Sequence, residues 1–292
     1  MKPSVSFLIV NYHTSDLVLK LVESIRMHIR QFDYEILVGD NSMDDAERMK
    51  ISALDKVIVT DLGGNLGFVK ANNRLFARAK NDVVIAINPD TLLTDNSLET
   101  IVEYIVAHPE VGVAGPKLLN ADGSYQISFY RFPSVGTLIE ELFFFGFRDP
   151  YAYTGSVDSE RCVDVVKGAC LVFRKNVIRD AVFFDERFVM YSEEVDFCRR
   201  MKIQGLRTVY FPGATILHFG EQSSGKKNAS KYSLYHYYRS KIYYFRIHHE
   251  RNVLPLIILA LMVKTIIFAL IGKFDVARLH FEIAVLITKQ DS

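Results

Sequence analysis

Short apolar runs alternate with amphipathic stretches along the first half of this chain. Several runs are rich in β-branched residues and end on polar ones, which is typical of strands buried on both faces. The strands predicted in this way are residues 5–11, 34–40, 57–61, 83–88 and 112–115. Apolar residues at helical spacing predict helices over residues 17–29, 68–79 and 97–107. The alternation predicts an α/β fold, with a mostly parallel central sheet and helices on both faces.

The second half of the chain opens with a long segment of weak periodicity. Residues 125–161 combine aromatic residues, prolines and glycines, so we expect a loop over a substrate cleft, with a hairpin or short helix around residues 138–147. Residues 163–174 are strand-like, and residues 194–204 predict a helix that Gly205 would terminate. The last two strands predicted are residues 208–211 and 215–218.

The C-terminal part of the chain changes character. Residues 253–271 are almost wholly apolar, and a bilayer span needs about 20 such residues, but a central charge such as Lys264 costs about 2.5–3.5 kcal/mol on insertion scales. The preceding residues 232–251 are rich in tyrosines and cations of the kind that settle at a headgroup interface. These features favour an anchor in the plane of a membrane over a span. The alternative is a buried C-terminal helix or a homo-oligomer interface.

Composition and charge exclude some classes of protein. The chain has 292 residues, 49% of them hydrophobic, and a formal net charge of +1, so nucleic acid is not an expected partner. Cations nevertheless gather between residues 225 and 251, which indicates an anionic surface or a phosphate-bearing partner. The three cysteines have no zinc or disulfide spacing, and the N-terminus lacks the order of a signal peptide. We therefore expect the α/β part to work in a reducing compartment, on the cytoplasmic side of a membrane.

Polar side chains stand where apolar runs end. The candidates are Asn88, Asp90, Glu193, Glu194, Asp196 and His218. Because open α/β sheets bind ligands at the carboxyl ends of their strands, these residues could form a divalent-metal site beside a general base. The structural alternatives are a turn cap for the aspartate, acids stabilised by a helix N-terminus, and a histidine that only packs.

The order of the motifs carries a family resemblance. Strand ends at Asn11 and Asp40, a glycine- and asparagine-bearing turn at residues 63–68, an Asn-Pro-Asp motif and a Glu-Glu-Val-Asp motif follow one another along the chain. Together they resemble an inverting family 2 glycosyltransferase of the bacterial rhamnosyltransferase-like branch, over residues 3–222. The resemblance implies the glycosyltransferase A-type fold, which is Rossmann-like.

The resemblance also implies a nucleotide-sugar site. The residues that match its motifs are Asn11, Asp40, Asn41, Asn65, Gly67, Asn72, Asn88, Lys167 and Gly168. A carboxylate at Asp40 can accept the imide N–H of uracil or thymine. The glycines of the turn permit close backbone approach, and the helix N-terminus that follows favours a diphosphate. The structural alternatives are capping and turn formation at the strand ends, an ordinary glycine turn at residues 63–68, and an interior strand glycine at Gly168.

Metal and base positions follow from the same resemblance. Asp90 and His218 match positions that hold Mg²⁺ or Mn²⁺ against the diphosphate, although Asn88 stands where the family has a first aspartate. Glu194 matches the catalytic carboxylate, with Glu in place of Asp, and would take the proton from the acceptor hydroxyl. Glu193 and Asp196 remain alternatives for this base.

The resemblance implies transfer of a sugar, with L-rhamnose from dTDP-L-rhamnose favoured, to a hydroxyl of a growing, lipid-linked cell-surface glycan. A UDP-hexose or UDP-galactofuranose donor is the alternative within this class, and a nucleotidyltransferase or a tethered non-catalytic scaffold lies outside it. We expect a catalytic domain at residues 1–222, with a nucleotide-binding half at 1–120 and an acceptor half at 121–222. Residues 223–292 would then attach the enzyme, as a peripheral or monotopic protein, to the cytoplasmic face of the bacterial inner membrane.

Overall fold

The computed structural model describes residues 2–143, 149–153, 156–179, 182–220 and 231–291. These residues form two compact units that interleave along the sequence. The sheet unit comprises the described residues within 1–132, 152–186 and 193–225, and the helical unit those within 133–151, 187–192 and 226–292. The units therefore do not follow a single cut at residue 222, and the functional division drawn there stays a prediction.

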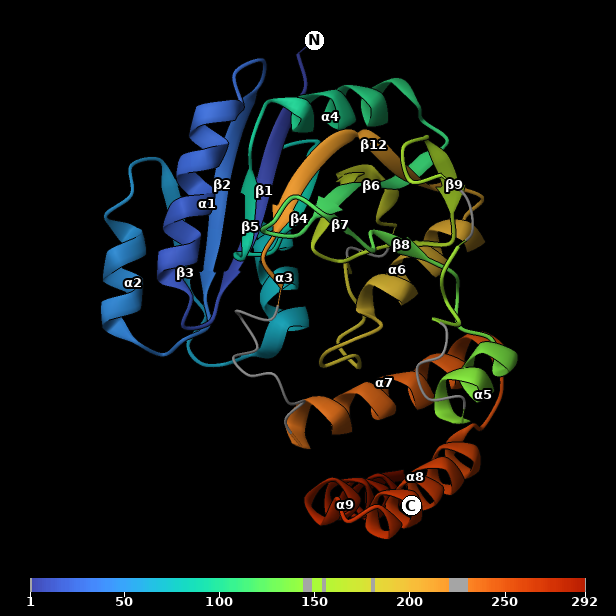
Figure 1. Cartoon of the computed structure of the whole chain (residues 1–292). Coiled ribbons are helices and arrows are strands. Elements are labelled where there is room, and N and C mark those ends of the chain that lie inside the picture. Colours follow the sequence, from blue (N-terminus) through green and yellow to red (C-terminus); the bar gives the residue numbers. More distant parts are fainter. Residues whose placement is uncertain (1, 144–148, 154–155, 180–181, 221–230, 292) are drawn as a thin grey trace. The chain divides into compact units, whose positions relative to one another are not determined.

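A mixed sheet forms the core of the sheet unit, in the strand order β3-β2-β1-β4-β11-β6-β12-β5 (Figure 1). Six strands run in one direction: β1 (Ser4–Asn11), β2 (Asp33–Asp40), β3 (Val57–Asp61), β4 (Val83–Ile87), β6 (Val111–Leu119) and β12 (Arg207–His218). The other two strands in this order run against them: β11 (Cys170–Arg174) and β5 (Thr91–Leu93). The predicted mostly parallel sheet is confirmed.

Strand register brings the polar strand ends to one edge of this sheet. Asn11 pairs with Asp40 across β1 and β2, and His218 of β12 pairs with Thr91 of β5, directly after Asp90. The antiparallel strand β11 starts at the same edge, since its Cys170 lies opposite Ile87, the last residue of β4. Residues distant in sequence therefore meet at the carboxyl ends of the parallel strands.

Helices flank the sheet in two pairs (Figure 1). The pair α1 (Ser15–His28) and α4 (Ser97–Ala107) is joined by Glu99, whose Oε1 accepts the backbone N–H of Gln31 at 2.7 Å. The pair α3 (Gly67–Arg78) and α6 (Glu193–Ile203) is joined by an aromatic cluster that includes Phe173 of β11. A further helix, α2 (Asp45–Ser52), was not predicted and is capped by the Asp44 carboxylate.

The helix expected at residues 194–204 is confirmed by α6. Gly205 follows its end with φ +79°, and the N–H of Leu206 reaches the carbonyl of Met201 at 2.9 Å. This is the left-handed glycine termination that the sequence predicted.

The strands expected in the second half differ in detail. Residues 163–174 are not one strand: β9 (Arg161–Val163) and β10 (Val165–Val166) precede a turn, and β11 follows it. Conversely, the two strands expected at 208–218 are one, β12, because its partner β6 continues from Pro116 to Lys117 while β12 bulges between Phe211 and Thr215. In the expected loop, β7 (Tyr125–Gln126) pairs with β6 and β8 (Phe129–Tyr130) with β10. Strands of two residues are too short to show periodicity.

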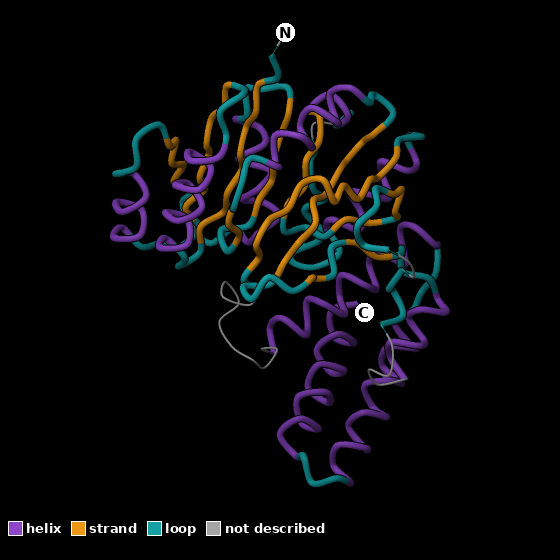
Figure 2. The backbone as a smooth tube through the Cα atoms, turned by 45° about the horizontal axis from the view of Figure 1, so that its top comes forward, coloured by secondary structure: helices purple, strands orange, loops and turns teal. Residues whose placement is uncertain are grey.

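The helical unit consists of four helices in its described residues (Figure 2). They are α5 (Val135–Phe143), α7 (Lys231–His249), α8 (Leu254–Leu270) and α9 (Phe274–Asp291). The helix expected around residues 138–147 corresponds to α5, and its last residues, 144–147, lie outside the described part. Among the described helices, none combines the length and the apolar composition that crossing a membrane requires.

A buried ion pair ties α5 to α7 within the helical unit. The Lys241 ammonium contacts the Glu141 carboxylate, and their side chains are only 6% and 19% exposed. The hydroxyls of Tyr151 and Tyr237 donate to the same carboxylate, and these contacts hold the pKa of Glu141 below its usual value although burial alone would raise it. A buried charge that is paired in this way is costly to leave without its partner.

We expect Lys241→Met to destabilise the protein by about 3–5 kcal/mol, because the Glu141 charge would remain buried and unpaired. The double variant Glu141→Gln with Lys241→Met should recover most of that loss, since a neutral amide can accept from one tyrosine hydroxyl and donate to the oxygen of the other. Urea unfolding of the wild type, the single variant and the double variant measures the free energy of unfolding of each. Equal losses of stability in the single and double variants would show that the unpaired Glu141 charge is not the cause of the destabilisation.

Candidate active site

The first cluster of the site lies at the ends of β1 and β2. Asp40 Oδ1 accepts hydrogen bonds from Asn11 Nδ2 at 3.2 Å and from Ser42 Oγ at 2.6 Å. Asp40 is 2% exposed, and its Oδ2 has no hydrogen-bond partner within the described chain. A buried carboxylate oxygen of this kind calls for a donor from a ligand or water. The structure therefore brings Asn11 and Asp40 together and leaves one oxygen available.

Asn41 and Asn65 hold the turn that leads into α3. Asn41 Nδ2 donates to Asn65 Oδ1 at 3.0 Å, and the backbone N–H groups of Leu66 and Gly67 donate to the two amide oxygens at 2.7 and 3.0 Å. Gly63 has φ +72° in the same turn, which a side chain would strain. These amides shape the turn, and its backbone N–H groups precede a helix N-terminus.

Asn72 lies apart from this turn. It is buried in α3, and its Nδ2 donates to the Phe68 carbonyl of the same helix at 3.0 Å. That contact lies within the helix, and a role for Asn72 in donor binding stays a prediction.

The second cluster joins the end of β4 to the end of β12. Asn88 precedes a tight turn that Thr91 closes through its N–H and hydroxyl, both directed at the Asn88 carbonyl. The N–H of Phe219 donates to the Asp90 carbonyl at 2.9 Å, and this bond holds the end of β12 next to the turn. As a result, His218 Nε2 lies 3.5 Å from Asp90 Oδ1.

The Asp90–His218 pair fits a divalent cation. Asp90 is 1% exposed, and its Oδ1 is a buried atom without a hydrogen bond to any described residue. Such an oxygen facing an imidazole nitrogen suits Mg²⁺ or Mn²⁺. The described residues contain no group of three His, Cys, Asp or Glu side chains that could hold a metal. Asp90 and His218 would hold the ion from two sides only, which leaves room for the phosphate oxygens and waters that such cations commonly bind.

The acidic cluster stands at the N-terminus of α6. The Tyr130 hydroxyl donates to Glu194 Oε1, whereas Glu194 Oε2 is shielded from solvent and has no hydrogen bond in the described part of the chain. Burial raises the pKa of the Glu194 carboxyl, and burial together with the Glu194 charge raises the pKa of Glu193 to about 8. Asp196 Oδ2 accepts from Arg200 Nε at 2.8 Å, one turn along the same helix. Of the three acids, Glu194 combines a fixed oxygen with an unengaged one.

A turn at residues 167–169 places Lys167 and Gly168 beside the Asp90–His218 cluster and the acidic cluster of α6. The N–H of Asn88 donates to the Ala169 carbonyl at 2.9 Å, and a Cβ on Gly168 would lie 3.5 Å from Glu194 Cβ. Burial lowers the pKa of Lys167, while the charges of Glu194 and Asp90 act in the opposite direction. The ammonium group therefore lies within electrostatic reach of both carboxylates.

Sequence reasoning missed Gln126 and Tyr130, which belong to this site. Tyr130 contacts Glu194, and Gln126 Oε1 lies 2.6 Å from His218 Nδ1 and 3.3 Å from Lys167 Nζ. A signal existed, since polar residues alternate with Ile127 and Phe129 in this segment. The alternation spans only five residues within a long aperiodic stretch, which as a whole predicts a loop.

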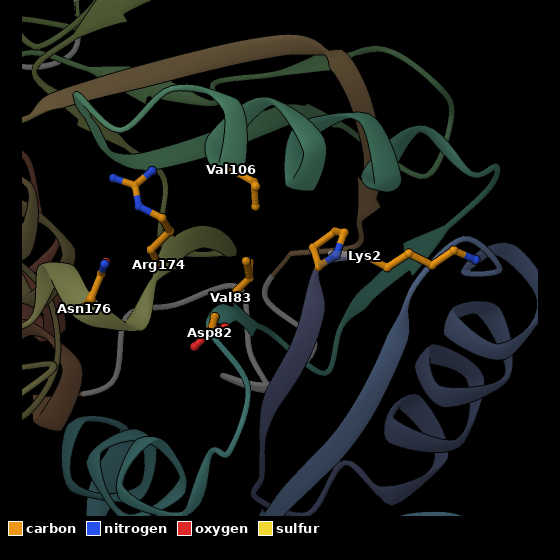
Figure 3. A pocket seen from close by; sticks show the side chains of 7 residues that line it. Lys2, Asp82, Val83, Val106, Arg174 and Asn176 are labelled. Atoms are coloured by element: carbon orange, nitrogen blue, oxygen red, sulfur yellow. The ribbon is translucent and has the colours of Figure 1, made fainter.

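A pocket of about 410 Å³ lies at the opposite edge of the sheet (Figure 3). It is lined by Lys2, Pro3, Asp82, Val83, Val106, Arg174 and Asn176. Its Arg174 guanidinium donates to backbone carbonyls, among them those of Pro109 at 2.7 Å and Val111 at 2.9 Å. This guanidinium is therefore engaged in structure, and none of the predicted site residues lines this pocket.

Comparison with known sequences finds relatives that match more than two thirds of this chain. Residues 3–233 match the family described as "Glycosyltransferase like family 2". The N-acetylglucosaminyl-diphospho-decaprenol L-rhamnosyltransferase of Mycobacterium tuberculosis is 31% identical over 69% of this chain and 71% of its own length. The rhamnosyltransferase WbbL of Escherichia coli is 25% identical over 75% of this chain and 85% of its own.

Comparison with solved structures supports the fold. A mannosyltransferase from Pyrobaculum calidifontis, in complex with GDP-Man and Mn²⁺, has a TM-score of 0.58 at 12% identity and covers 86% of this chain and 65% of its own. S. aureus TarS has a TM-score of 0.54 at 15% identity and covers 99% of this chain and 92% of its own.

Proposed function

This chain belongs to glycosyltransferase family 2, and we propose that it transfers L-rhamnose from dTDP-L-rhamnose to a hydroxyl of a lipid-linked glycan, with inversion. One observation carries the proposal. Asp90 Oδ1 is buried, has no hydrogen bond to any described residue, and faces His218 at the sheet edge where Glu194 also lies. The rhamnose donor and the lipid-linked acceptor are inferred from what the relatives in M. tuberculosis and E. coli are named for. Membership of the family sets aside the nucleotidyltransferase and scaffold alternatives.

Donor binding in this proposal begins at the ends of β1 and β2. The free Oδ2 of Asp40 accepts the imide N–H of the base, while Asn11 and Ser42 hold the other oxygen. The N-terminus of α3 offers the positive end of its helix dipole to the diphosphate, while Asn41 and Asn65 hold the turn before it by accepting the N–H groups of Leu66 and Gly67. Uracil and thymine carry the same imide, so a UDP-sugar donor remains the alternative that this contact accepts equally.

The nucleoside diphosphate leaving group would bind at the cluster of Asp90 and His218. Asp90 and His218 would hold Mg²⁺ or Mn²⁺, which when bound neutralises charge on the departing nucleoside diphosphate. The side chains of Asn88 and Lys167 lie at the same edge and can contact the sugar or the phosphates.

Proton removal from the acceptor falls to Glu194. Tyr130 fixes Oε1, so Oε2 is the atom that takes the proton as the acceptor oxygen attacks the anomeric carbon. A raised pKa makes this carboxylate a stronger base than an exposed glutamate. Glu193, whose pKa of about 8 keeps it largely protonated at neutral pH, is the weaker candidate.

Attachment to the cytoplasmic face of a membrane would involve α8 and α9. The two helices pack on each other and expose large apolar side chains, with Leu270 81% and Phe274 69% exposed. The tyrosines before them contribute less than expected, because Tyr238 and Tyr244 are buried within the helical unit. Lys264 Nζ reaches the Tyr238 hydroxyl at 3.4 Å, so the cation turns inward and leaves the outer face of α8 apolar. Such a hairpin suits an in-plane anchor.

We expect Asp90→Asn to lower donor turnover by about a hundredfold or more, because charge stabilisation by a bound metal is worth several kcal/mol. EDTA should abolish wild-type turnover, and added Mg²⁺ or Mn²⁺ should restore it. The control is Asp33→Asn, which neutralises an exposed carboxylate at the other end of β2. Turnover that persists in EDTA, or an active Asp90→Asn enzyme, would remove the metal from the proposal.

Glu194→Gln should keep donor binding but lower transfer by about a hundredfold to ten-thousandfold, since the amide keeps its volume and cannot take a proton. Wild-type transfer should decline as the pH falls through the raised pKa of Glu194, above the usual value of 4.5, because the protonated carboxyl is inactive. Isothermal titration with dTDP and a pH–rate profile measure both effects. If Glu193→Gln or Asp196→Asn is the inactive variant instead, the base is reassigned.

The variant Leu270→Ser with Phe274→Ser should bind anionic vesicles at least about tenfold more weakly, because burying each side chain contributes about 1.5–3 kcal/mol. Salt should weaken wild-type binding without abolishing it. Ile203→Ser, which alters a 70% exposed apolar residue of the sheet unit, is the matched control. Vesicle binding that is unchanged in the double variant would contradict the membrane anchor. If sedimentation shows that wild type is a dimer and the double variant a monomer, the face is a dimer interface instead.

A further inference from the structure

Gln126 has an orientation that its neighbours determine. Its Nε2 donates to Asn120 Oδ1 at 2.9 Å and to the His218 carbonyl at 3.2 Å. Asn120 is itself oriented, because its Nδ2 donates to Ser124 Oγ at 2.9 Å. Both groups that face Gln126 Nε2 are therefore acceptors, and the amide oxygen must point the other way.

The amide oxygen of Gln126 then decides where His218 carries its proton. An amide oxygen can only accept, and it lies 2.6 Å from His218 Nδ1, so the hydrogen of the neutral ring is on Nδ1. The lone pair is left on Nε2, the nitrogen that faces Asp90 Oδ1 at 3.5 Å. Two acceptor atoms at this separation, with no proton between them, form a gap suited to a cation.

The same oxygen also accepts from Lys167. Its Nζ lies 3.3 Å from Gln126 Oε1, which places the ammonium close to the metal pair without contacting it. One amide thus orients a histidine on β12 and a lysine in the turn before β11.

We propose that Gln126 is a positioning residue that holds His218 in its metal-binding tautomer and so presets the Asp90–His218 pair for Mg²⁺ or Mn²⁺. The inference rests on the proposed metal site and adds to it a residue from a strand that no motif marked. Groups that orient a ligating histidine through its second nitrogen typically change metal affinity by about 10–100-fold when removed.

The test measures metal binding directly, through the electron paramagnetic resonance signal of free Mn²⁺ titrated with protein and dTDP. We expect Gln126→Leu to weaken Mn²⁺ binding by about 10–100-fold. Gln126→Glu keeps an acceptor for Nδ1, but its second oxygen meets the two acceptors that Nε2 faces, so we expect it to bind Mn²⁺ more tightly than Gln126→Leu and no more tightly than wild type. Asp33→Asn, which alters an exposed carboxylate at the other end of β2, is the control and should bind Mn²⁺ as wild type does.

A second measurement needs no variant at position 126. In metal-free wild type labelled with ¹⁵N-histidine, the His218 signals, assigned by their loss in His218→Asn, should show a protonated Nδ1 and an unprotonated Nε2. A protonated Nε2 overturns the inference, as does Mn²⁺ binding by Gln126→Leu that equals wild type. Equal weakening in Gln126→Leu and Gln126→Glu also overturns it, because that pattern means a packing role. If wild type itself binds no Mn²⁺ with dTDP, the metal site of the proposed function has failed, and the inference falls with it.

Discussion

The site depends on a carboxylate oxygen that is buried at the edge of the sheet without a partner among the described residues. Asp90 is held there by backbone geometry, since the turn after β4 and the end of β12 are joined at the Asp90 carbonyl. An unpaired buried charge costs free energy, and a fold keeps it only where something compensates. The surrounding residues follow from this constraint: His218 faces the oxygen, Gln126 orients His218, and Lys167 adds a positive charge nearby.

The two acids at the start of α6 show a second balance between stability and chemistry. Burial raises the pKa of both Glu193 and Glu194, so holding both ionised is unfavourable. Hydrogen bonds from Tyr130 and from backbone N–H groups at the helix N-terminus partly offset that burial for Glu194. Glu194 therefore keeps the more favourable environment for a negative charge, and its Oε2 has no hydrogen bond in the described chain. A base at neutral pH needs this combination.

In the helical unit, by contrast, the buried charges are paired with each other. Its Glu141–Lys241 pair is surrounded by tyrosine hydroxyls, so the carboxylate is satisfied and carries no free oxygen of the kind seen at Asp90. Its apolar residues divide between an inner set, such as Ile257 and Leu261, and the exposed set on α8 and α9. The charged cluster therefore stabilises the unit, and the exposed face of α8 and α9 is the surface that we propose binds a membrane.

Features that depend on local pattern are legible in the order of residues along the chain. Buried parallel strands appear as continuous apolar runs, and the polar residues that end them mark Asn11, Asp40 and Asp90 as neighbours at one sheet edge. The start of α6 and its glycine termination are equally legible, because helix ends carry local chemical signals. Since strand direction alone defines this edge, the order of the runs is enough to locate the site.

Features that depend on partners distant in sequence emerge only when the chain is folded. The strands that carry Gln126 and Tyr130 are two residues long and exist only because β6 and β10 pair with them. The insertion of β11 between β4 and β6, against their direction, sets Lys167 and Gly168 at the carboxyl edge. Burial of Tyr238 and Tyr244 on α7 likewise comes from tertiary packing and not from composition. Non-local pairing supplies the stability of these elements, and a single sequence does not display which distant segments will meet.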